Sequence, residues 1–214
     1  MNRRSWLSVV LCLAAFALGP GPALARARAQ AGPPAEAVRV AIETTAGTLV
    51  VETDPRAPIT SANFLRYVDE HRLDGATFYR GMVVAPGVGL VQGGTSNAPE
   101  RLLAPIAHEP TSQTGLSHTD GALSMARWDP GTATGDFFII VGDLTWLDAG
   151  RSAPADPGFA VFGHVVEGMD LVRQILAAPK SPTEGEGVMR GQMLEDPVRI
   201  TSAHRVEAAA PASE

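Results

Sequence analysis

Apolar and polar positions alternate along most of the chain, beginning near residue 38. Val38, Val40 and Ile42 are separated by single charged or small residues, which is the period of two typical of a half-buried strand. A turn at residues 45–47 follows, and residues 48–53 are predicted to pair with the first strand as a hairpin. The remaining strand-like runs are residues 77–84, 90–92, 122–125, 137–141, 160–166 and 198–206.

The spacing of apolar residues changes to that of a helix in two places. Pro58 suits a first helical turn, apolar positions recur at helical spacing through Val68, and Asp74-Gly75 ends the run. A second helix is predicted over residues 169–178, with Pro179 just beyond it. Many short strands and only two helices favour a closed barrel or a sandwich over an alternating βαβ sheet.

The first 25 residues have a different character. Arg3 and Arg4 precede an almost unbroken apolar run over residues 6–18, and Ala23-Leu24-Ala25 fits a cleavage site. This layout predicts a secretory signal peptide over residues 1–25, and with it a periplasmic or secreted protein. The alternative is an uncleaved N-terminal anchor, although the apolar run is short for a membrane span.

The composition of the chain indicates one domain with a short segment of different composition on either side of it. Residues 26–37 are rich in Ala, Gly, Pro and Gln and are predicted to form a flexible lead, and residues 207–214 a disordered tail. The domain then spans residues 38–206. It contains three long irregular stretches, and in a compact domain such stretches usually have a function or lie over a site. They are residues 94–116, 149–158 and 179–196.

Charge and cysteine content exclude several classes of function. The chain of 214 residues has 17 basic and 23 acidic side chains and no basic cluster, so neither nucleic acid nor, after cleavage, a membrane is an expected partner. Cys12, the one cysteine, lies in the predicted signal peptide, so a cleaved chain would have no disulfide and no thiol nucleophile. The phosphate-loop, nucleophile-elbow and zinc-helix motifs are absent from the sequence.

His118 and Asp120 are close enough in sequence to share a metal, which gives a metal-dependent hydrolase as one alternative. Hydrogen bonds within a turn are the plainer interpretation.

Several short motifs remain after these exclusions, and each is unremarkable alone. Phe137, Phe138 and Phe162, for example, suit the large inward-facing positions of a barrel. The motifs, in chain order, are Phe78-Tyr79-Arg80, Leu90-Val91-Gln92-Gly93-Gly94, Gly121-Ala122-Leu123-Ser124-Met125-Ala126-Arg127, Phe137-Phe138-Ile139, Trp146-Leu147-Asp148, Phe159-Ala160-Val161-Phe162-Gly163 and Val165-Val166-Glu167-Gly168-Met169. Together they resemble the cyclophilin family over residues 38–206.

The resemblance implies a mainly β fold: a closed eight-stranded antiparallel barrel capped by two α-helices, with a proline-binding groove on its outer face. It also implies a peptidyl-prolyl cis-trans isomerase that acts on X-Pro bonds of exported polypeptides and assists their folding, without cofactor or metal. We expect proline-containing polypeptides as partners and a monomeric protein. The alternative is a proline-peptide-binding or chaperone module of the same fold, with weak or no catalysis.

The same resemblance implies roles for individual residues. Arg80 is the expected catalytic residue. The expected substrate-binding residues are Gln92, Leu90, Ala126, Arg127, Asp136, Phe138, Trp146, Leu147 and Phe159. Of these, Gln92 and the backbone near Arg127 would hold the peptide, and Trp146 would stand at the rim of an apolar pocket. The lining of that pocket would be Leu90, Phe138, Leu147 and Phe159.

These residue types suit the chemistry. Rotation about an X-Pro bond is opposed by a resonance barrier of about 18–20 kcal/mol, which falls when the twisted amide is stabilised relative to both planar forms. A guanidinium does this by donating to the prolyl nitrogen or the carbonyl oxygen. An arginine such as Arg80 stays charged and holds its donors in a rigid fork. No nucleophile, metal or cofactor takes part in such a step.

Three features depart from the family pattern. The spacing between Arg80 and Gln92 is longer, and Gly89 stands where a pocket Phe is expected. Asp136 stands where the pattern has a Gln. We expect its carboxylate to lie near Arg80, Arg127 or both, in a charge-assisted pair that orients Arg80. One alternative is that such a pair occupies the donors that the twisted amide needs; the other is that Asp136 caps the nearby turn and faces water.

Overall fold

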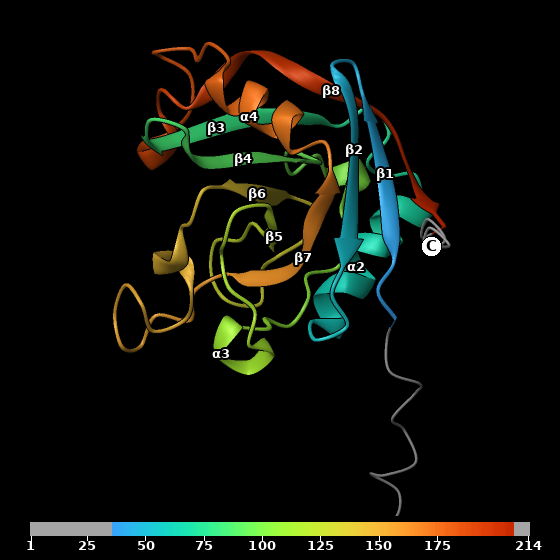
Figure 1. Cartoon of the computed structure of the whole chain (residues 1–214), viewed down its shortest axis with the longest axis vertical. Helices are drawn as coiled ribbons and strands as arrows, with labels where there is room; N and C mark the ends of the chain where they lie inside the picture. Colours follow the sequence, from blue (N-terminus) through green and yellow to red (C-terminus); the bar gives the residue numbers. More distant parts are fainter. Residues whose placement is uncertain (1–35, 208–214) are drawn as a thin grey trace, which may run out of the picture. The chain divides into compact units, whose positions relative to one another are not determined.

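The computed structural model describes residues 36–207, in which eight strands close into one antiparallel barrel (Figure 1). The strands are β1 (Arg39–Thr44), β2 (Gly47–Thr53), β3 (Thr77–Ala85), β4 (Val88–Gly94), β5 (Ala122–Met125), β6 (Phe137–Val141), β7 (Ala160–Glu167) and β8 (Met193–Val206). Around the barrel they follow the order β1-β2-β7-β5-β6-β4-β3-β8. The predicted fold class is therefore confirmed. The predicted signal peptide and most of the predicted lead and tail lie outside the described residues.

Three α-helices accompany the barrel in residues 36–207, where the sequence predicted two. α2 (Pro58–Asp69) contacts β7 and β8, whereas α4 (Met169–Ala177) contacts β2, β3, β4 and β6. The additional α3 (Thr111–Thr114) is a single turn inside a stretch predicted to be irregular, and Gly115 ends it at a φ of 71°. A helix this short contains no full apolar period, so periodicity misses it. None of the helices in this range is long and apolar enough to cross a membrane.

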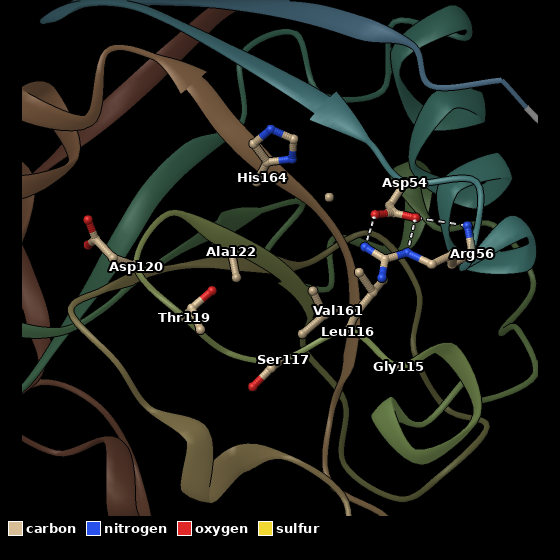
Figure 2. Close-up of a pocket in the computed structure, with 11 residues that line it drawn as sticks. Asp54, Arg56, Gly115, Leu116, Ser117, Thr119, Asp120, Ala122, Val161 and His164 are labelled. Carbon is tan, nitrogen blue, oxygen red and sulfur yellow. Dashed lines mark hydrogen bonds and ion pairs between the residues drawn. The ribbon is translucent and has the colours of Figure 1, made fainter.

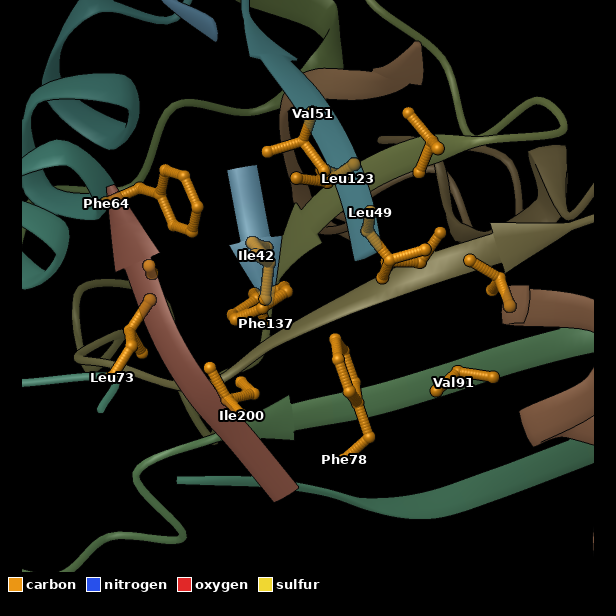
Figure 3. Close-up of a cluster of buried hydrophobic side chains, with 14 of the residues drawn as sticks. Ile42, Leu49, Val51, Phe64, Leu73, Phe78, Val91, Leu123, Phe137 and Ile200 are labelled. Atoms are coloured by element: carbon orange, nitrogen blue, oxygen red, sulfur yellow. The ribbon is translucent and has the colours of Figure 1, made fainter. Parts of the chain in front are cut away.

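Aromatic and branched apolar side chains fill the inside of the barrel (Figure 3). Phe137 meets Phe64 and Phe78 edge to face, with ring centroids 5.5 and 5.9 Å apart. This arrangement sets the positive edge of one ring against the negative face of another, which adds to the stabilisation from burial. The interior is therefore a packed core with no room for a ligand channel.

A second apolar group lies on the opposite face of the same strands. Successive residues of a strand point to opposite faces of the sheet. In β6, Phe137 therefore belongs to the interior and Phe138 to this second group. In β4, Val91 belongs to the interior and Leu90 to the second group. We call this group the outer cluster. Its buried members are Leu90, Ala122, Phe138, Ile140, Leu144, Leu147 and Val161, and Met82, Val88, Leu116, Ala126 and Phe159 pack against them.

The long spacing between Arg80 and Gln92 lengthens a hairpin. β3 and β4 are joined by the tight turn Pro86-Gly87, in which Gly87 has a φ of 72°. Arg80 and Gln92 remain direct cross-strand partners, so the extra residues extend the ladder instead of separating the two side chains. A Cβ at Gly89 would collide with the carbonyl oxygen of Met82, which explains why no aromatic side chain stands there.

The last strand begins earlier than predicted. The sequence pattern placed its start at Val198, whereas β8 begins at Met193. Met193 pairs with Arg80, and the register between β3 and β8 shifts between that pair and the pair Phe78–Val198. Pro197, which has no backbone N–H to donate to a neighbouring strand, lies between Met193 and Val198.

Candidate active site on the outer face of the barrel

The half-buried guanidinium of Arg80 lies between two glutamine side chains. Its Nη1 donates to Gln92 Oε1 at 2.6 Å, while Nε and Nη2 donate to Gln192 Oε1 at 2.9 and 2.7 Å. Burial lowers the pKa of Arg80, but an arginine remains cationic at any physiological pH. Three of its five N–H groups are thereby engaged by oxygen acceptors. The second N–H of Nη2 meets only the weakly accepting sulfur of Met82, at 3.8 Å, so one N–H on each Nη nitrogen can turn to a substrate.

Gln192 was not predicted as a site residue. It belongs to the stretch 179–196, which the sequence suggested would lie over a site, and it does contact the predicted catalytic residue. Its carbonyl oxygen accepts from Gly81 N–H at 2.9 Å, and its Nε2 donates to the carbonyl oxygen of Val188 at 2.8 Å. Backbone and side chain are both fixed, so the amide oxygen is held facing Arg80.

The residues predicted to line the pocket all belong to the outer cluster. Leu90, Phe138 and Leu147 are buried in it, and Phe159 and Ala126 pack against it. The rings of Phe138 and Phe159 meet edge to face with centroids 5.5 Å apart. The structure therefore brings together, on one outer face, side chains that lie far apart in the sequence.

Arg127 packs on an aromatic side chain of this cluster, and Trp146 directly precedes Leu147 in the chain. The guanidinium carbon of Arg127 stands 4.7 Å from the centroid of the Phe159 ring, a cation–π arrangement. Its Nη1 donates to the carbonyl oxygen of Trp128 at 2.9 Å, and its Nη2 donates to that of Gly158. Trp146 is 46% exposed. The side chain of Arg127 thus covers an aromatic wall, a contact that was not predicted.

The expected pairing of Asp136 with an arginine is wrong. Its buried carboxylate accepts hydrogen bonds from Ser96 N–H at 2.8 Å, from Tyr79 OH at 3.2 Å and from Thr95 Oγ1 at 3.3 Å. Burial raises the pKa of Asp136, against the lowering effect of these donors. The physical reason for the error is that the donors of Arg80 are directed at glutamine oxygens, while a backbone N–H and two hydroxyls satisfy the carboxylate.

Residues 39–205 match the model of the family described as cyclophilin type peptidyl-prolyl cis-trans isomerase/CLD. The chain belongs to the cyclophilin family. The peptidyl-prolyl cis-trans isomerase of Acinetobacter baylyi is 38% identical over 168 residues, which are 76% of this chain and 82% of the relative. Peptidyl-prolyl cis-trans isomerase B of Escherichia coli is 34% identical over 168 residues, 76% of this chain and 96% of the relative. The predicted family and enzyme class are confirmed.

Solved structures support the fold. The crystal structure of a cyclophilin type isomerase from Cryptosporidium parvum superposes with a TM-score of 0.63 at 19% identity, covering 81% of this chain and 99% of that one. A second structure of the same protein, described as determined in the presence of the dipeptide Ala-Pro, matches with the same TM-score at 20% identity. At such low identity the likeness concerns the barrel architecture alone.

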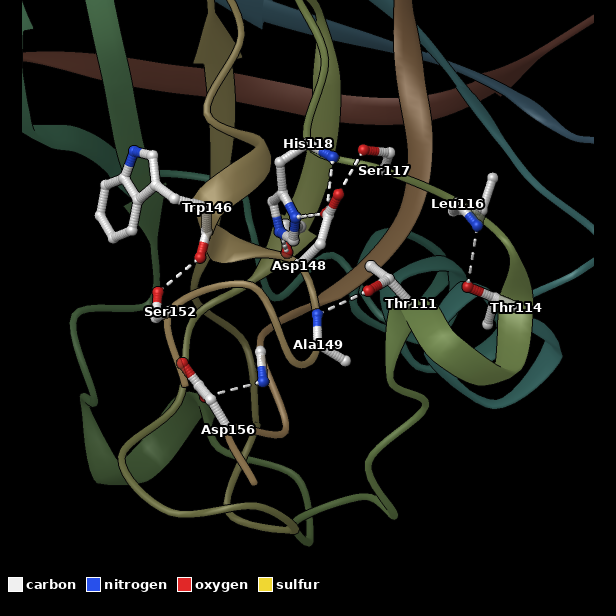
Figure 4. A network of polar contacts seen from close by, with 12 residues as sticks. Thr111, Thr114, Leu116, Ser117, His118, Trp146, Asp148, Ala149, Ser152 and Asp156 are labelled. Carbon is white, nitrogen blue, oxygen red and sulfur yellow. Dashed lines mark hydrogen bonds and ion pairs between the residues drawn. The ribbon is translucent and has the colours of Figure 1, made fainter. Parts of the chain in front are cut away.

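A buried polar network around His118 and Asp148 contacts the outer cluster of this cyclophilin (Figure 4). His118 Nδ1 lies 2.6 Å from Asp148 Oδ1, and its Nε2 lies 3.0 Å from Ser124 Oγ. The His118 ring stacks on Phe138 with centroids 6.0 Å apart. Burial lowers the pKa of His118, although Asp148 opposes the effect. Ser124 is fully buried, so Ser124, His118 and Asp148 cannot act as a nucleophilic triad, and the network instead fixes the His118 ring against Phe138.

The metal-site alternative finds no support in the geometry. Both ring nitrogens of His118 are directed at Asp148 and Ser124, whereas Asp120 accepts from Gly142 N–H at 2.7 Å and pairs with Arg173 at 2.9 Å. Over residues 36–207, no three His, Cys, Asp or Glu side chains gather as metal ligands would.

A depression of about 260 Å³ lies away from Arg80 (Figure 2). Asp54, Arg56 and His164 are among the residues that line it. Asp54 and Arg56 form an ion pair at 2.7 Å, and the guanidinium lowers the pKa of the Asp54 carboxyl. Because these two charges satisfy each other, they offer no free group for chemistry on a bound ligand.

Proposed function

We propose that this cyclophilin catalyses the cis-trans isomerisation of X-Pro bonds at the face formed by Arg80 and the outer cluster. The observation that supports this most strongly is a juxtaposition. Met82 packs against the outer cluster, and its sulfur lies 3.8 Å from Arg80 Nη2. A fixed cation with free N–H donors therefore stands beside an apolar surface, which is what a prolyl ring and its preceding amide require.

The proposed mechanism uses no covalent chemistry. Phe138 and Leu147 would hold the prolyl ring while the rest of the peptide rotates. Planarity and the resonance of the amide are lost together as the bond twists, so the lone pair of the prolyl nitrogen becomes an acceptor only near the transition state. A donor from Arg80 then binds the twisted amide more strongly than either planar form, and the barrier falls in both directions.

The proposed substrates are polypeptides outside the cytoplasm. The sequence of residues 1–25, with Arg3 and Arg4 before an apolar run and Ala23-Leu24-Ala25 after it, supports export to the periplasm or beyond. We further propose that the exported domain acts as a monomer on proline-containing chains and assists their folding, since slow X-Pro isomerisation limits the folding of many proteins.

A second candidate function is binding of proline-containing segments with little catalysis. Gly89 favours it, because the family pattern expects a pocket Phe at this position and the glycine supplies no aromatic side chain. A module of this kind would keep the apolar cluster and the glutamine contacts, but would not depend on a donor from Arg80.

One comparison of rates separates the two candidates. Cis-trans exchange in a short X-Pro peptide would be measured by NMR with the wild type, with Arg80→Ala and with Arg173→Ala. Removal of a transition-state donor lowers kcat by about a hundredfold or more in other enzymes, so we expect a loss of that size for Arg80→Ala with an unchanged melting transition. Arg173 is the matched control, since it is a half-exposed arginine on α4 that pairs with Asp120. Equal rates for Arg80→Ala and the wild type would leave only the binding function.

A further inference from the structure

Four side chains form an unbroken hydrogen-bonded series from the candidate catalytic group to a buried acid. Arg80 Nη1 donates to Gln92 Oε1 at 2.6 Å, and Gln92 Nε2 donates to Tyr79 OH at 2.7 Å. Tyr79 OH in turn donates to Asp136 Oδ2 at 3.2 Å. Every donor in the series faces away from the guanidinium and toward the carboxylate.

The direction of the series decides how the amide of Gln92 is oriented. A glutamine amide presents an acceptor on one side and a donor on the other, and only the oxygen can face Arg80 favourably. A tyrosine hydroxyl has a single hydrogen. When Asp136 takes that hydrogen, the hydroxyl oxygen of Tyr79 must accept, so Gln92 turns its Nε2 toward Tyr79 and its Oε1 toward Arg80.

The buried end of the series is itself fixed. Ser96 N–H and Thr95 Oγ1 both donate to Asp136 Oδ1, which leaves Oδ2 for Tyr79. The Asp136 side chain belongs to no ion pair among residues 36–207, and the residue is only 5% exposed. In so buried a setting, consecutive hydrogen bonds polarise one another, and the negative charge strengthens those that point toward it.

We propose that Tyr79 and Asp136 are positioning residues for Arg80, which hold the Gln92 amide in the one orientation that accepts from the guanidinium. This inference rests on the proposed isomerase function and adds two residues to its machinery. Asp136, which stands where the family pattern has a Gln, is thereby connected through Tyr79 to the residues around Arg80. The negative charge acts on Arg80 through two neutral groups, so it takes none of the donors that the substrate needs.

The proposal makes a specific statement about Asp136→Asn. Ser96 N–H and Thr95 Oγ1 would keep the side-chain oxygen, so the new amide nitrogen would face Tyr79 and donate to it. The Tyr79 hydroxyl would then donate to Gln92 Oε1, and the amide would flip and present its N–H groups to the N–H groups of Arg80. A substitution of one atom thus reverses the series and displaces the guanidinium.

A double-mutant cycle on the full domain tests this statement. We expect Tyr79→Phe and Asp136→Asn each to lower kcat by about tenfold with little change in KM, and the double variant to lose no more than the worse single variant. Thr60→Val is the matched control, because it removes a hydrogen bond from another buried hydroxyl to another buried carboxylate, that of Glu109, and lies outside the series, so it should leave kcat unchanged. Additive losses, or an equal loss in Thr60→Val, would overturn the proposal.

Two further measurements distinguish positioning from general damage to the fold. In the Arg80→Ala background, Tyr79→Phe should have no additional effect on kcat. If Arg80→Ala is impaired while Tyr79→Phe and Asp136→Asn are not, the positioning role fails and the isomerase function stands. If Arg80→Ala itself is fully active, the proposed function fails first.

The pH profile supplies a readout that a structural role would not change. Protonation of Asp136 removes its preference for the Tyr79 hydrogen, so kcat of the wild type should fall as the pH drops through the pKa of Asp136, which burial raises. The titratable groups that face it are Tyr79 of β3 and Tyr67 of α2, and the pKa of each is raised above its usual value, so both stay neutral in acid. The same acid limb should be absent from Asp136→Asn; its persistence there would overturn the proposal.

Discussion

Gln192 offers the sharpest test of how Arg80 is held from its other side. A single oxygen, Gln192 Oε1, accepts from both Nε and Nη2 of the guanidinium, at 2.9 and 2.7 Å. Gln192→Ala deletes this acceptor and leaves Gln92 as the remaining side-chain oxygen that holds Arg80. The guanidinium is then free to rotate about its contact with Gln92, and the fraction of time that its free donors face a bound prolyl amide falls.

The size of the effect follows from where the contact lies. Hydrogen bonds to a charged group contribute about 1.5–3 kcal/mol when the partner left behind is buried. Here the Arg80 side chain is half-buried and the Gln192 side chain reaches the surface, so water can replace much of what is lost. We therefore expect a net loss of about 1 kcal/mol in transition-state stabilisation, which corresponds to about a fivefold decrease in kcat/KM. The melting temperature should stay within the small range usual for surface substitutions.

The assay is cis-trans exchange of a short X-Pro peptide, followed by NMR at several peptide concentrations so that kcat and KM separate. Thr183→Ala serves as the control, because Thr183 is an exposed residue of the same loop. A rise in activity in Gln192→Ala would refute the reasoning, since it would mean that Gln192 competes with the substrate for the donors of Arg80. Unchanged activity would show that Gln92 alone fixes the guanidinium.

Two other expectations follow from the sequence and the hairpin. Gly89→Ala places a methyl group against the Met82 carbonyl oxygen in the β3–β4 ladder, so we expect a loss of stability of about 1–3 kcal/mol, measured by chemical denaturation. Gly87→Ala tests whether the effect is steric, because a Cβ there meets open space, although its positive φ adds strain of its own. Export predicts that protein recovered from its own cell envelope lacks residues 1–25, which mass spectrometry checks; an intact Met1 on cytoplasmic protein would contradict it.

Local patterns were sufficient for most of the barrel. Alternation in β1 and β2 predicted the first hairpin, and apolar runs placed β5 and β6 within a residue of their observed bounds. Period-two alternation also explains why Phe137 and Phe138 diverge, although it does not say which of the two faces inward. The start of β8 was missed because its first residues form a strand by pairing with β3. Pairing between strands that are far apart in the chain cannot be recognised from the sequence pattern of either strand alone.

The site was predicted as a set of residues and not as a set of contacts. The order of motifs predicted Arg80 and a set of apolar side chains as site residues, and the structure places Arg80 beside the cluster that contains those side chains. The partner of Asp136 was predicted wrongly, because charge complementarity favoured an arginine while the fold supplied Ser96 N–H and a hydroxyl. Gln192 lies far along the chain from Arg80, so only the three-dimensional course of its loop could reveal the contact.

The two faces of β4 and β6 tie the chemistry of this protein to the correctness of its folding. Val91 and Leu90 are neighbours in the chain, yet one completes the interior and the other the outer cluster. A slip of one residue in the pairing of these strands would exchange the two sets, so that interior side chains would face outward and those of the outer cluster inward. Recovery of isomerase activity during refolding should therefore report native strand register, and it should lag behind any signal that detects collapse alone.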